Sequence, residues 1–157
     1  MNLAIGQSAP EFSLFNTEKT KISLTDFKGK NVIILFFPLA FSGVCTKEMC
    51  SVQENFSAYQ KLNAEIIGIS VDSLFTLNKF KQEYHLDFNL LSDFNKETAT
   101  LYNCLFETFV FEMSGVAKRS TFVLDKEGTI RFIEILESAG DLPDFDAIQN
   151  CLKELNA

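Results

Sequence analysis

The chain has 157 residues, the size of one compact domain, and a chain of this length buries about 68–70% of its unfolded surface in a single core. Its formal net charge is −7, so a nucleic acid or an anionic membrane surface would repel most of it. It has four cysteines and one histidine, too few for a secreted disulfide scaffold or for most zinc centres. We therefore expect a single domain over residues 1–157, with no metal and with no nucleic acid or membrane partner.

The first elements in the chain are short strands. Residues 11–14 and 21–24 alternate apolar and polar side chains around a polar turn, which is typical of a β-hairpin. Residues 31–37 are apolar after the first position and rich in β-branched and aromatic side chains, which predicts a strand buried on both faces that ends at Pro38. The longest apolar run, residues 32–41, is too short to span a bilayer, and the sequence does not open with a signal-peptide pattern. We therefore expect a soluble, cytoplasmic protein.

Helical periodicity begins after this strand. Apolar side chains recur at helical spacing over residues 46–62, which predicts one long amphipathic helix. Residues 65–71 predict a second buried strand. A second helix follows over residues 74–84, and either Asp72 or Ser73 can cap it. The first half of the chain therefore has the order β-α-β-α after its hairpin.

The carboxy-terminal half predicts a mixture of strands and helices. Residues 88–91 form a short strand, and residues 96–105 form a helix. Residues 120–125 and 129–136 alternate apolar and polar side chains around a short turn with glycine, which predicts a second hairpin. A last helix opens at Pro143. Together these elements predict an α/β fold in which helices cover both faces of a mixed sheet.

One cysteine lies at a strand-to-helix junction. Cys45 falls in the first turn of the long helix, where unpaired N–H groups and the positive end of the helix dipole favour a thiolate. A helix start contributes at most about 2 kcal/mol, whereas lowering a thiol pKa from about 8.5 to about 6 requires about 3.4 kcal/mol. A cation is therefore needed. Lys47 can turn into solvent, so Arg119, next to the strand over residues 120–125, is the best candidate.

The residues around Cys45 resemble a known motif. Residues 38–45 read Pro-Leu-Ala-Phe-Ser-Gly-Val-Cys, which resembles the peroxiredoxin active-site motif Pro-x-x-x-Thr/Ser-x-x-Cys. Arg119, followed by Ser-Thr-Phe-Val-Leu-Asp, is similar to the active-site arginine of that family. The resemblance extends to residues 6–14 and 24–30, and so covers most of the chain. It implies a thioredoxin-like fold, with a central mixed β-sheet flanked by helices and an N-terminal β-hairpin.

The resemblance also implies a role for each residue of the motif. Cys45 would be the peroxidatic cysteine, which attacks the O–O bond of a hydroperoxide and becomes a sulfenic acid. Ser42 would hydrogen-bond the peroxide, Arg119 would stabilise the thiolate and the peroxide oxygens, and Pro38 would shield the site from water. Ser42 replaces the commoner threonine and lacks the methyl group that fixes the rotamer. Glu48 is either an ordinary acidic residue of a first helical turn or, as peroxiredoxins suggest, the ion-pair partner that orients Arg119.

A second cysteine follows on the same helix. Cys50 is five residues after Cys45, a spacing seen in the peroxiredoxin Q or bacterioferritin comigratory protein group, where the second cysteine resolves the sulfenic acid as a disulfide. In an intact helix the two Cα atoms would be about 8.7 Å apart, beyond the limit of about 7 Å for a disulfide, so the helix must unwind first. Two alternatives stay open. Cys50 can be a buried apolar side chain, and residues 38–44 also resemble the one-cysteine alkyl hydroperoxide reductase E group, in which external thiols resolve the sulfenic acid.

By this resemblance the protein is a thiol peroxidase for hydrogen peroxide and organic hydroperoxides. It would need no organic cofactor, and thioredoxin or a glutaredoxin-like reductant would recycle it. Two rival functions share parts of the same chemistry. A thiol-disulfide oxidoreductase normally uses Cys-x-x-Cys, whereas this chain has Cys-x-x-x-x-Cys. A peroxide sensor that relays oxidation to a partner protein would share the first step, and the sequence does not separate it from the peroxidase.

The remaining cysteines and one apolar segment complete the expectations. Cys104 and Cys151 are expected to be structural, because free cysteines are often buried. Residues 105–113 are rich in phenylalanine and are expected to form a loop before Arg119. An exposed apolar loop at that place would line the peroxide pocket or form a dimer contact, so we expect a monomer or a homodimer.

Overall fold

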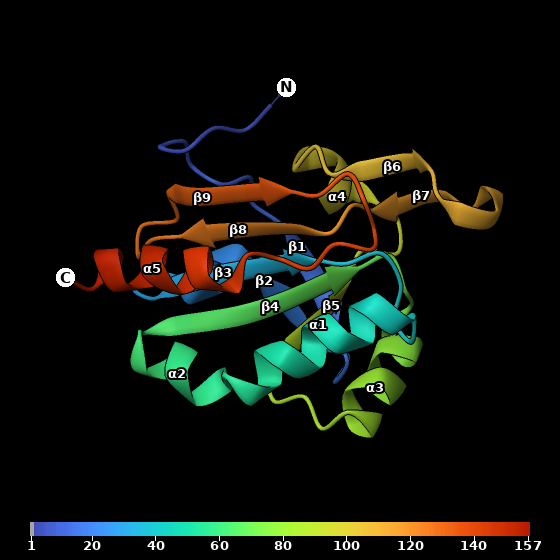
Figure 1. The fold of residues 1–157 in the computed structure, drawn as a ribbon, viewed down its shortest axis with the longest axis horizontal. Coiled ribbons are helices and arrows are strands. Elements are labelled where there is room, and N and C mark those ends of the chain that lie inside the picture. Colours follow the sequence, from blue (N-terminus) through green and yellow to red (C-terminus); the bar gives the residue numbers. More distant parts are fainter. Residues whose placement is uncertain (1) are drawn as a thin grey trace.

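A seven-stranded mixed sheet forms the centre of the molecule (Figure 1). The computed structural model describes residues 2–157. In the strand order β2-β1-β5-β4-β3-β8-β9, the β3, β4 and β5 strands are parallel and the other neighbours are antiparallel. The strands are β1 (Ser13–Asn16), β2 (Lys21–Ser23), β3 (Asn31–Phe36), β4 (Ala64–Ser70), β5 (Asn89–Ser92), β8 (Ser120–Leu124) and β9 (Ile130–Ile135). The α/β class, the mixed sheet and the N-terminal hairpin are confirmed.

Helices cover both faces of this sheet. One face packs against α1 (Gly43–Glu54), α2 (Phe56–Lys61), α3 (Leu74–Glu83) and α5 (Phe145–Leu155). Figure 1 shows α1 and α2 lying one after the other along this side. The opposite face packs against the short helix α4 (Glu97–Leu101) and the 3-10 helix η1 (Leu24–Phe27). Each face of the sheet therefore has its own hydrophobic core. All six residues of β3 are buried, because Ile33 and Leu35 belong to the core under α1, whereas Ile34 and Phe36 belong to the core under α4.

The prediction of one helix over residues 46–62 was wrong, because the helix is interrupted at Asn55. Asn55 separates α1 from α2 and has φ −102° and ψ 12°. Its side-chain amide donates to the carbonyl oxygen of Ser51 at 3.0 Å, and its backbone N–H bonds to the carbonyl oxygen of Val52 at 3.2 Å. An asparagine side chain that competes for helix carbonyl groups in this way favours a break.

The segment before Arg119 also differs from the prediction. Instead of a helix over residues 96–105 followed by a loop, α4 ends at Leu101 and an antiparallel hairpin follows. This hairpin consists of β6 (Leu105–Thr108), the 3-10 turn η2 (Val110–Glu112) and β7 (Ser114–Ala117). Asn103 adopts the left-handed conformation, with φ 53°, which commonly ends a helix. The other strands and helices lie within a few residues of their predicted positions.

The sheet topology brings distant residues to one edge. The parallel strands β3 and β4 end at the same edge, with Phe36 opposite Ile69. After β3 the chain turns into α1. The antiparallel strand β8 begins at the same edge, with Ser120 opposite Phe36. Cys45 at the start of α1 and Arg119 just before β8 therefore meet, although they are 74 residues apart in the sequence.

Two further findings concern residues 2–157 as a whole. No helix in this part of the chain is long and apolar enough to cross a membrane. Over the same residues, no group of three or more histidine, cysteine or carboxylate side chains is arranged to hold a metal ion.

Candidate active site

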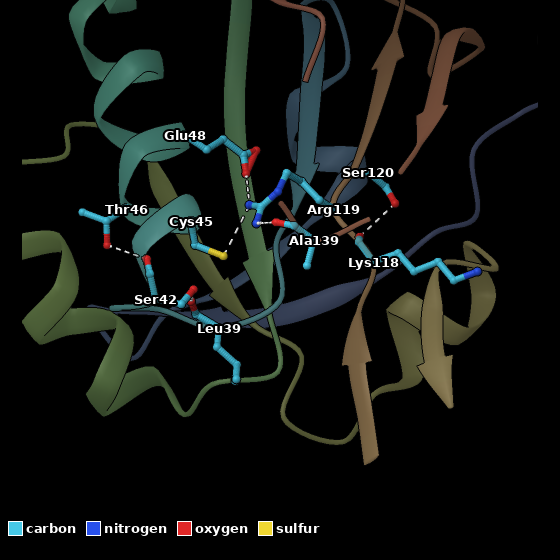
Figure 2. Close-up of polar contacts among 9 residues, drawn as sticks. All are labelled: Leu39, Ser42, Cys45, Thr46, Glu48, Lys118, Arg119, Ser120 and Ala139. Atoms are coloured by element: carbon cyan, nitrogen blue, oxygen red, sulfur yellow. Dashed lines mark hydrogen bonds and ion pairs between the residues drawn. The ribbon is translucent and has the colours of Figure 1, made fainter. Parts of the chain in front are cut away.

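Cys45 and Arg119 form the centre of the site. Cys45 is fully buried in the first turn of α1. Nη1 of Arg119 lies 3.3 Å from Sγ of Cys45. Figure 2 shows the two side chains pointing toward each other, joined by a dashed line. Arg119 is only 1% exposed, so its charge acts across a region with little water, where charges interact more strongly than in solvent. A guanidinium and a helix start thus both stabilise negative charge on one sulfur atom.

Two acceptors fix the guanidinium beside the thiol. Nη1 of Arg119 lies 2.7 Å from Oε1 of Glu48, which is itself fully buried, and Nη2 donates to the carbonyl oxygen of Ala139 at 3.0 Å. Burial alone would lower the pKa of Arg119, but Glu48 and Cys45 more than offset this effect and raise it. Arg119 therefore stays charged and keeps one orientation.

The Glu48 carboxyl is unusual in its proton affinity. Burial raises its pKa from 4.5 to about 7, although the charge of Arg119 and the hydrogen bond from it oppose this rise. Glu134 on β9 adds a smaller effect that also raises the pKa. Oε2 of Glu48 has no hydrogen-bond partner among the described residues. A single guanidinium thus faces both a carboxyl group and a thiol, and burial shifts the titration of the carboxyl group toward neutral pH.

The loop between β3 and α1 carries the other predicted site residues. Pro38 is buried, whereas Ser42 is exposed at the N-cap position of α1. The hydroxyl group of Ser42 donates to the carbonyl oxygen of Leu39 at 2.7 Å (Figure 2). The first backbone bond of α1 runs from the N–H of Thr46 to the carbonyl oxygen of Ser42 at 2.9 Å. The N–H groups before Thr46, including that of Cys45, belong to the unpaired start of a helix.

Cys50 lies further along the same helix and apart from Cys45. Both thiols are free, and α1 continues from Gly43 to Glu54, so ideal helix geometry places their Cα atoms about 8.7 Å apart. Cys50 is partly exposed, and its pKa is raised by burial and by the neighbouring Glu54. In this conformation the helix holds the two sulfur atoms on separate turns.

The other two cysteines lie outside this site. Cys104 is buried in the core on the opposite face of the sheet, where burial raises its pKa to about 12. Cys151 is partly buried on α5, and burial and Glu154 raise its pKa. Neither lies beside a buried arginine.

Two contacts around the site had no clear signal in the sequence. The carbonyl oxygen of Ala139 holds Arg119, and a backbone acceptor is not encoded by residue type. Asp72, which the sequence suggested only as a helix cap, accepts a hydrogen bond from the backbone N–H of Ala40 at 2.8 Å. The available signal was that Asp72 directly follows the buried strand predicted over residues 65–71. The folded sheet places the end of this strand beside the end of β3.

Comparison with known proteins identifies the family. Residues 5–133 match the AhpC/TSA family. The chain belongs to this family. It is 38% identical over 132 residues to "Putative peroxiredoxin bcp" from Coxiella burnetii, covering 83% of this chain and 87% of that protein. It is 34% identical over 128 residues to "Peroxiredoxin Q, chloroplastic" from Oryza sativa subsp. japonica, covering 82% of this chain and 57% of that protein.

A solved structure supports the fold. The crystal structure of peroxidoxin BcpB from Mycobacterium tuberculosis superposes with a TM-score of 0.88, at 24% identity, and covers 99% of this chain and all of that one. The thioredoxin-like peroxiredoxin fold is therefore confirmed. Peroxiredoxins are thiol-dependent peroxidases, so the predicted enzyme class is confirmed as well, with a peroxide as substrate and a thiol as reductant.

Proposed function

We propose that Cys45 is the peroxidatic thiol and that it reduces hydrogen peroxide and organic hydroperoxides. The observation that carries this proposal is the 3.3 Å distance between Nη1 of Arg119 and Sγ of Cys45 at the start of a helix. In the reaction the Cys45 thiolate attacks one peroxide oxygen, and the O–O bond breaks. Cys45 becomes a sulfenic acid, and the second oxygen takes up a proton and leaves as water or an alcohol.

The neighbouring residues orient the peroxide in this proposal. The Ser42 hydroxyl donates to Leu39 and still has lone pairs, so it accepts the O–H of the hydroperoxide. Arg119 and the backbone N–H of Cys45 face the oxygens on which charge develops, which is where fixed donors accelerate a reaction most. Pro38, which is buried, excludes water from the sulfur. Glu48 holds Arg119 in the required orientation.

Cys50 resolves the sulfenic acid in this proposal. The Cys50 thiol attacks the Cys45 sulfur, a disulfide forms, and water leaves. The intact helix keeps the two Cα atoms too far apart, so the first turns of α1 must unwind before the bond closes. Thioredoxin or a glutaredoxin-like protein then reduces the exposed disulfide.

Mass spectrometry after one equivalent of peroxide tests this resolving step. An internal disulfide removes two hydrogens from the protein, whereas a persistent sulfenic acid adds one oxygen. We expect the loss of two hydrogens in the wild type and the gain of oxygen in Cys50→Ser. A wild-type protein that keeps the oxygen would show that an external thiol resolves Cys45. A Cys45–Cys50 disulfide within an unbroken helix would contradict the unwinding step.

Kinetics test the peroxidase itself against the rival functions. Stopped-flow measurement of Cys45 oxidation, followed by steady-state turnover with thioredoxin, is expected to show a fast first step and repeated cycles. A slow first oxidation contradicts the proposal. Fast oxidation without recycling favours a peroxide sensor that relays oxidation to a partner.

We further propose that the protein works in the cytoplasm and forms a homodimer. Four free thiols suit a reducing compartment such as the cytoplasm.

The exposed tip of the β6–β7 hairpin supports the homodimer. Phe111 at this tip is 93% exposed, and Val110 beside it is 52% exposed. Such exposed apolar side chains favour a contact with a second copy and do not favour a role in the wall of the peroxide pocket. Sedimentation velocity at micromolar concentration measures the oligomeric state, and a monomer in that experiment would contradict the proposed homodimer.

A further inference from the structure

The loop over residues 38–41 is attached to the rest of the protein at few points. Within the loop region, the N–H and hydroxyl groups of Ser42 both bond to the carbonyl oxygen of Leu39. Among the described residues, one hydrogen bond joins residues 38–41 to a part of the chain outside this loop and α1. In it, the N–H of Ala40 donates to Oδ2 of Asp72 at 2.8 Å. Asp72 lies between β4 and α3. Asp72 is thus the hydrogen-bond acceptor outside the loop that holds its middle, between the end of β3 and the start of α1.

The ends of two strands hold Asp72, one through its side chain and one through its backbone. Oδ2 also accepts the hydroxyl of Ser70, at the end of β4, at 2.6 Å. The carbonyl oxygen of Asp72 accepts the hydroxyl of Ser92, at the end of β5, at 2.6 Å. Burial raises the pKa of Asp72, and the hydrogen bonds from Ser70 and from Ala40 oppose that rise. A partly buried carboxylate is costly unless it is hydrogen-bonded. Here Ser70 fixes the carboxylate, and Ser92 fixes the backbone that carries it.

The next residue of the loop is strained and held from the same side. Phe41 has φ 68°, a left-handed conformation that is an outlier for a bulky side chain. Its ring packs edge to face on Phe80, with 5.1 Å between centroids and an angle of 71°, and lies 6.3 Å from the ring of Tyr84. Strained residues persist only where surrounding contacts hold them. The segment over residues 72–84 therefore contacts two successive loop residues, Ala40 through a hydrogen bond and Phe41 through ring packing.

We propose that Asp72 is a positioning residue of the peroxidase, which together with Phe80 clamps residues 38–41 so that Pro38 and Ser42 stay oriented around the reacting sulfur. This inference rests on the proposed role of Cys45. Asp72 does not touch the sulfur or the substrate. It acts through Ala40, because a misplaced loop would present the peroxide to the sulfur in the wrong geometry.

The test compares two reactions of the same thiol in Asp72→Ala. Peroxide reduction needs the oriented loop, whereas alkylation by iodoacetamide needs only an ionised and accessible sulfur. We expect the rate constant with hydrogen peroxide to fall about tenfold to a hundredfold, as misplacement of reacting groups causes. The rate constant with iodoacetamide is expected not to fall, so the ratio of the two rates drops.

Two further variants separate positioning from general loss of structure. Asp72→Asn keeps an oxygen that accepts from both Ala40 and Ser70, so its ratio is expected to stay near that of the wild type. Asp93→Ala is the matched control, because the buried Asp93 accepts the backbone N–H groups of Thr98 and Ala99 at 3.0 and 2.8 Å and holds α4 instead of the loop. This control is expected to lower the thermal midpoint without changing the ratio.

The positioning role of Asp72 would be contradicted if the ratio of the peroxide rate to the iodoacetamide rate in Asp72→Ala equalled that of the wild type. It would also be contradicted if this ratio fell as far in Asp72→Asn, or in Asp93→Ala, as in Asp72→Ala. Failure of the proposed function looks different. In that case Cys45→Ser would keep peroxidase activity, whatever the Asp72 variants do.

Discussion

Cys45 and Cys104 are equally buried, but their surroundings are opposite in character. Cys45 lies at a helix start with a guanidinium 3.3 Å from its sulfur. Cys104 lies on the other face of the sheet among aromatic side chains, where burial raises its pKa to about 12, with only a partial offset from a hydrogen bond to Ser120. Burial by itself makes a thiol inert. A buried cation and a helix start are what distinguish the reactive position.

Serine substitutions give the largest contrast between the two cysteines. Cys45→Ser is expected to reduce peroxide consumption to the uncatalysed background, because an unactivated hydroxyl is a weak nucleophile. Cys104→Ser is expected to keep wild-type turnover. Peroxide consumption in the presence of a thiol reductant measures both. Residual turnover in Cys45→Ser, or its loss in a folded Cys104→Ser, would reverse the assignment.

The next contrast concerns two neighbouring cations. Arg119→Met removes the fixed donor and is expected to slow Cys45 oxidation by about 10²–10³, the usual cost of losing one such group. Arg119→Lys keeps a charge but not the fork that reaches Glu48 and Ala139 together, so we expect a smaller loss. Lys118→Met is the matched control, since Lys118 pairs with the exposed Glu137. Equal rates in the Arg119 and Lys118 variants would contradict a role for the guanidinium.

The Glu48 carboxyl predicts how stability depends on pH. Its pKa in the folded state, about 7, lies above the ordinary 4.5, so the folded protein binds this proton more tightly than the unfolded chain. The resulting stabilisation is complete below pH 4.5 and is lost as the pH rises through about 7. At about 1.4 kcal/mol per pKa unit, the loss amounts to up to about 3 kcal/mol.

Urea unfolding at pH 5 and at pH 8 measures this loss. Glu48→Gln has no proton to release and is expected to show a smaller decrease in the free energy of unfolding between the two pH values. Glu137→Gln, on the exposed surface, is expected to behave as the wild type. Equal decreases in Glu48→Gln and in the wild type would show that Glu48 is ionised throughout this range.

The smallest expected effects sharpen the comparison of structural thiols. Cys104→Ser places a hydroxyl in an apolar core and is expected to lower the free energy of unfolding by about 1–3 kcal/mol. Cys151→Ser, on the partly exposed side of α5, is expected to change it by less than about 0.5 kcal/mol. Thermal or urea unfolding measures both. A larger loss at Cys151 would show that its sulfur packs more tightly than its exposure indicates.

Much of the fold could be predicted, because burial on two faces leaves a clear pattern. The strand β3 is apolar after its first residue, and β4 is apolar apart from Glu65, Gly68 and Ser70. The apolar side chains of α5 recur at regular helical spacing. The break at Asn55 depends on a side-chain hydrogen bond to Ser51, which local periodicity does not reveal. The β6–β7 hairpin exposes Phe111, and an exposed phenylalanine in a strand-rich segment does not follow the usual alternation.

The site could be predicted only in part, for a related reason. Cys45 and Arg119 belong to residue patterns that stand out along the chain. The contacts from Ala139 and Asp72 come from a backbone oxygen and from a carboxylate that also precedes a helix cap. Such contacts depend on which strand ends meet at one sheet edge, and therefore on the register of the folded sheet.

Locating the oxidised sulfur tests the peroxidatic role of Cys45 most directly. Cys50→Ser prevents the internal disulfide, and one equivalent of hydrogen peroxide followed by a sulfenic-acid probe such as dimedone labels the reacting cysteine. Trypsin cleaves after Lys47, so the peptide over residues 31–47 contains Cys45 alone. We predict that this peptide carries the adduct. An adduct on the peptide of Cys104 or Cys151, with Cys45 unlabelled, would contradict the peroxidatic role of Cys45.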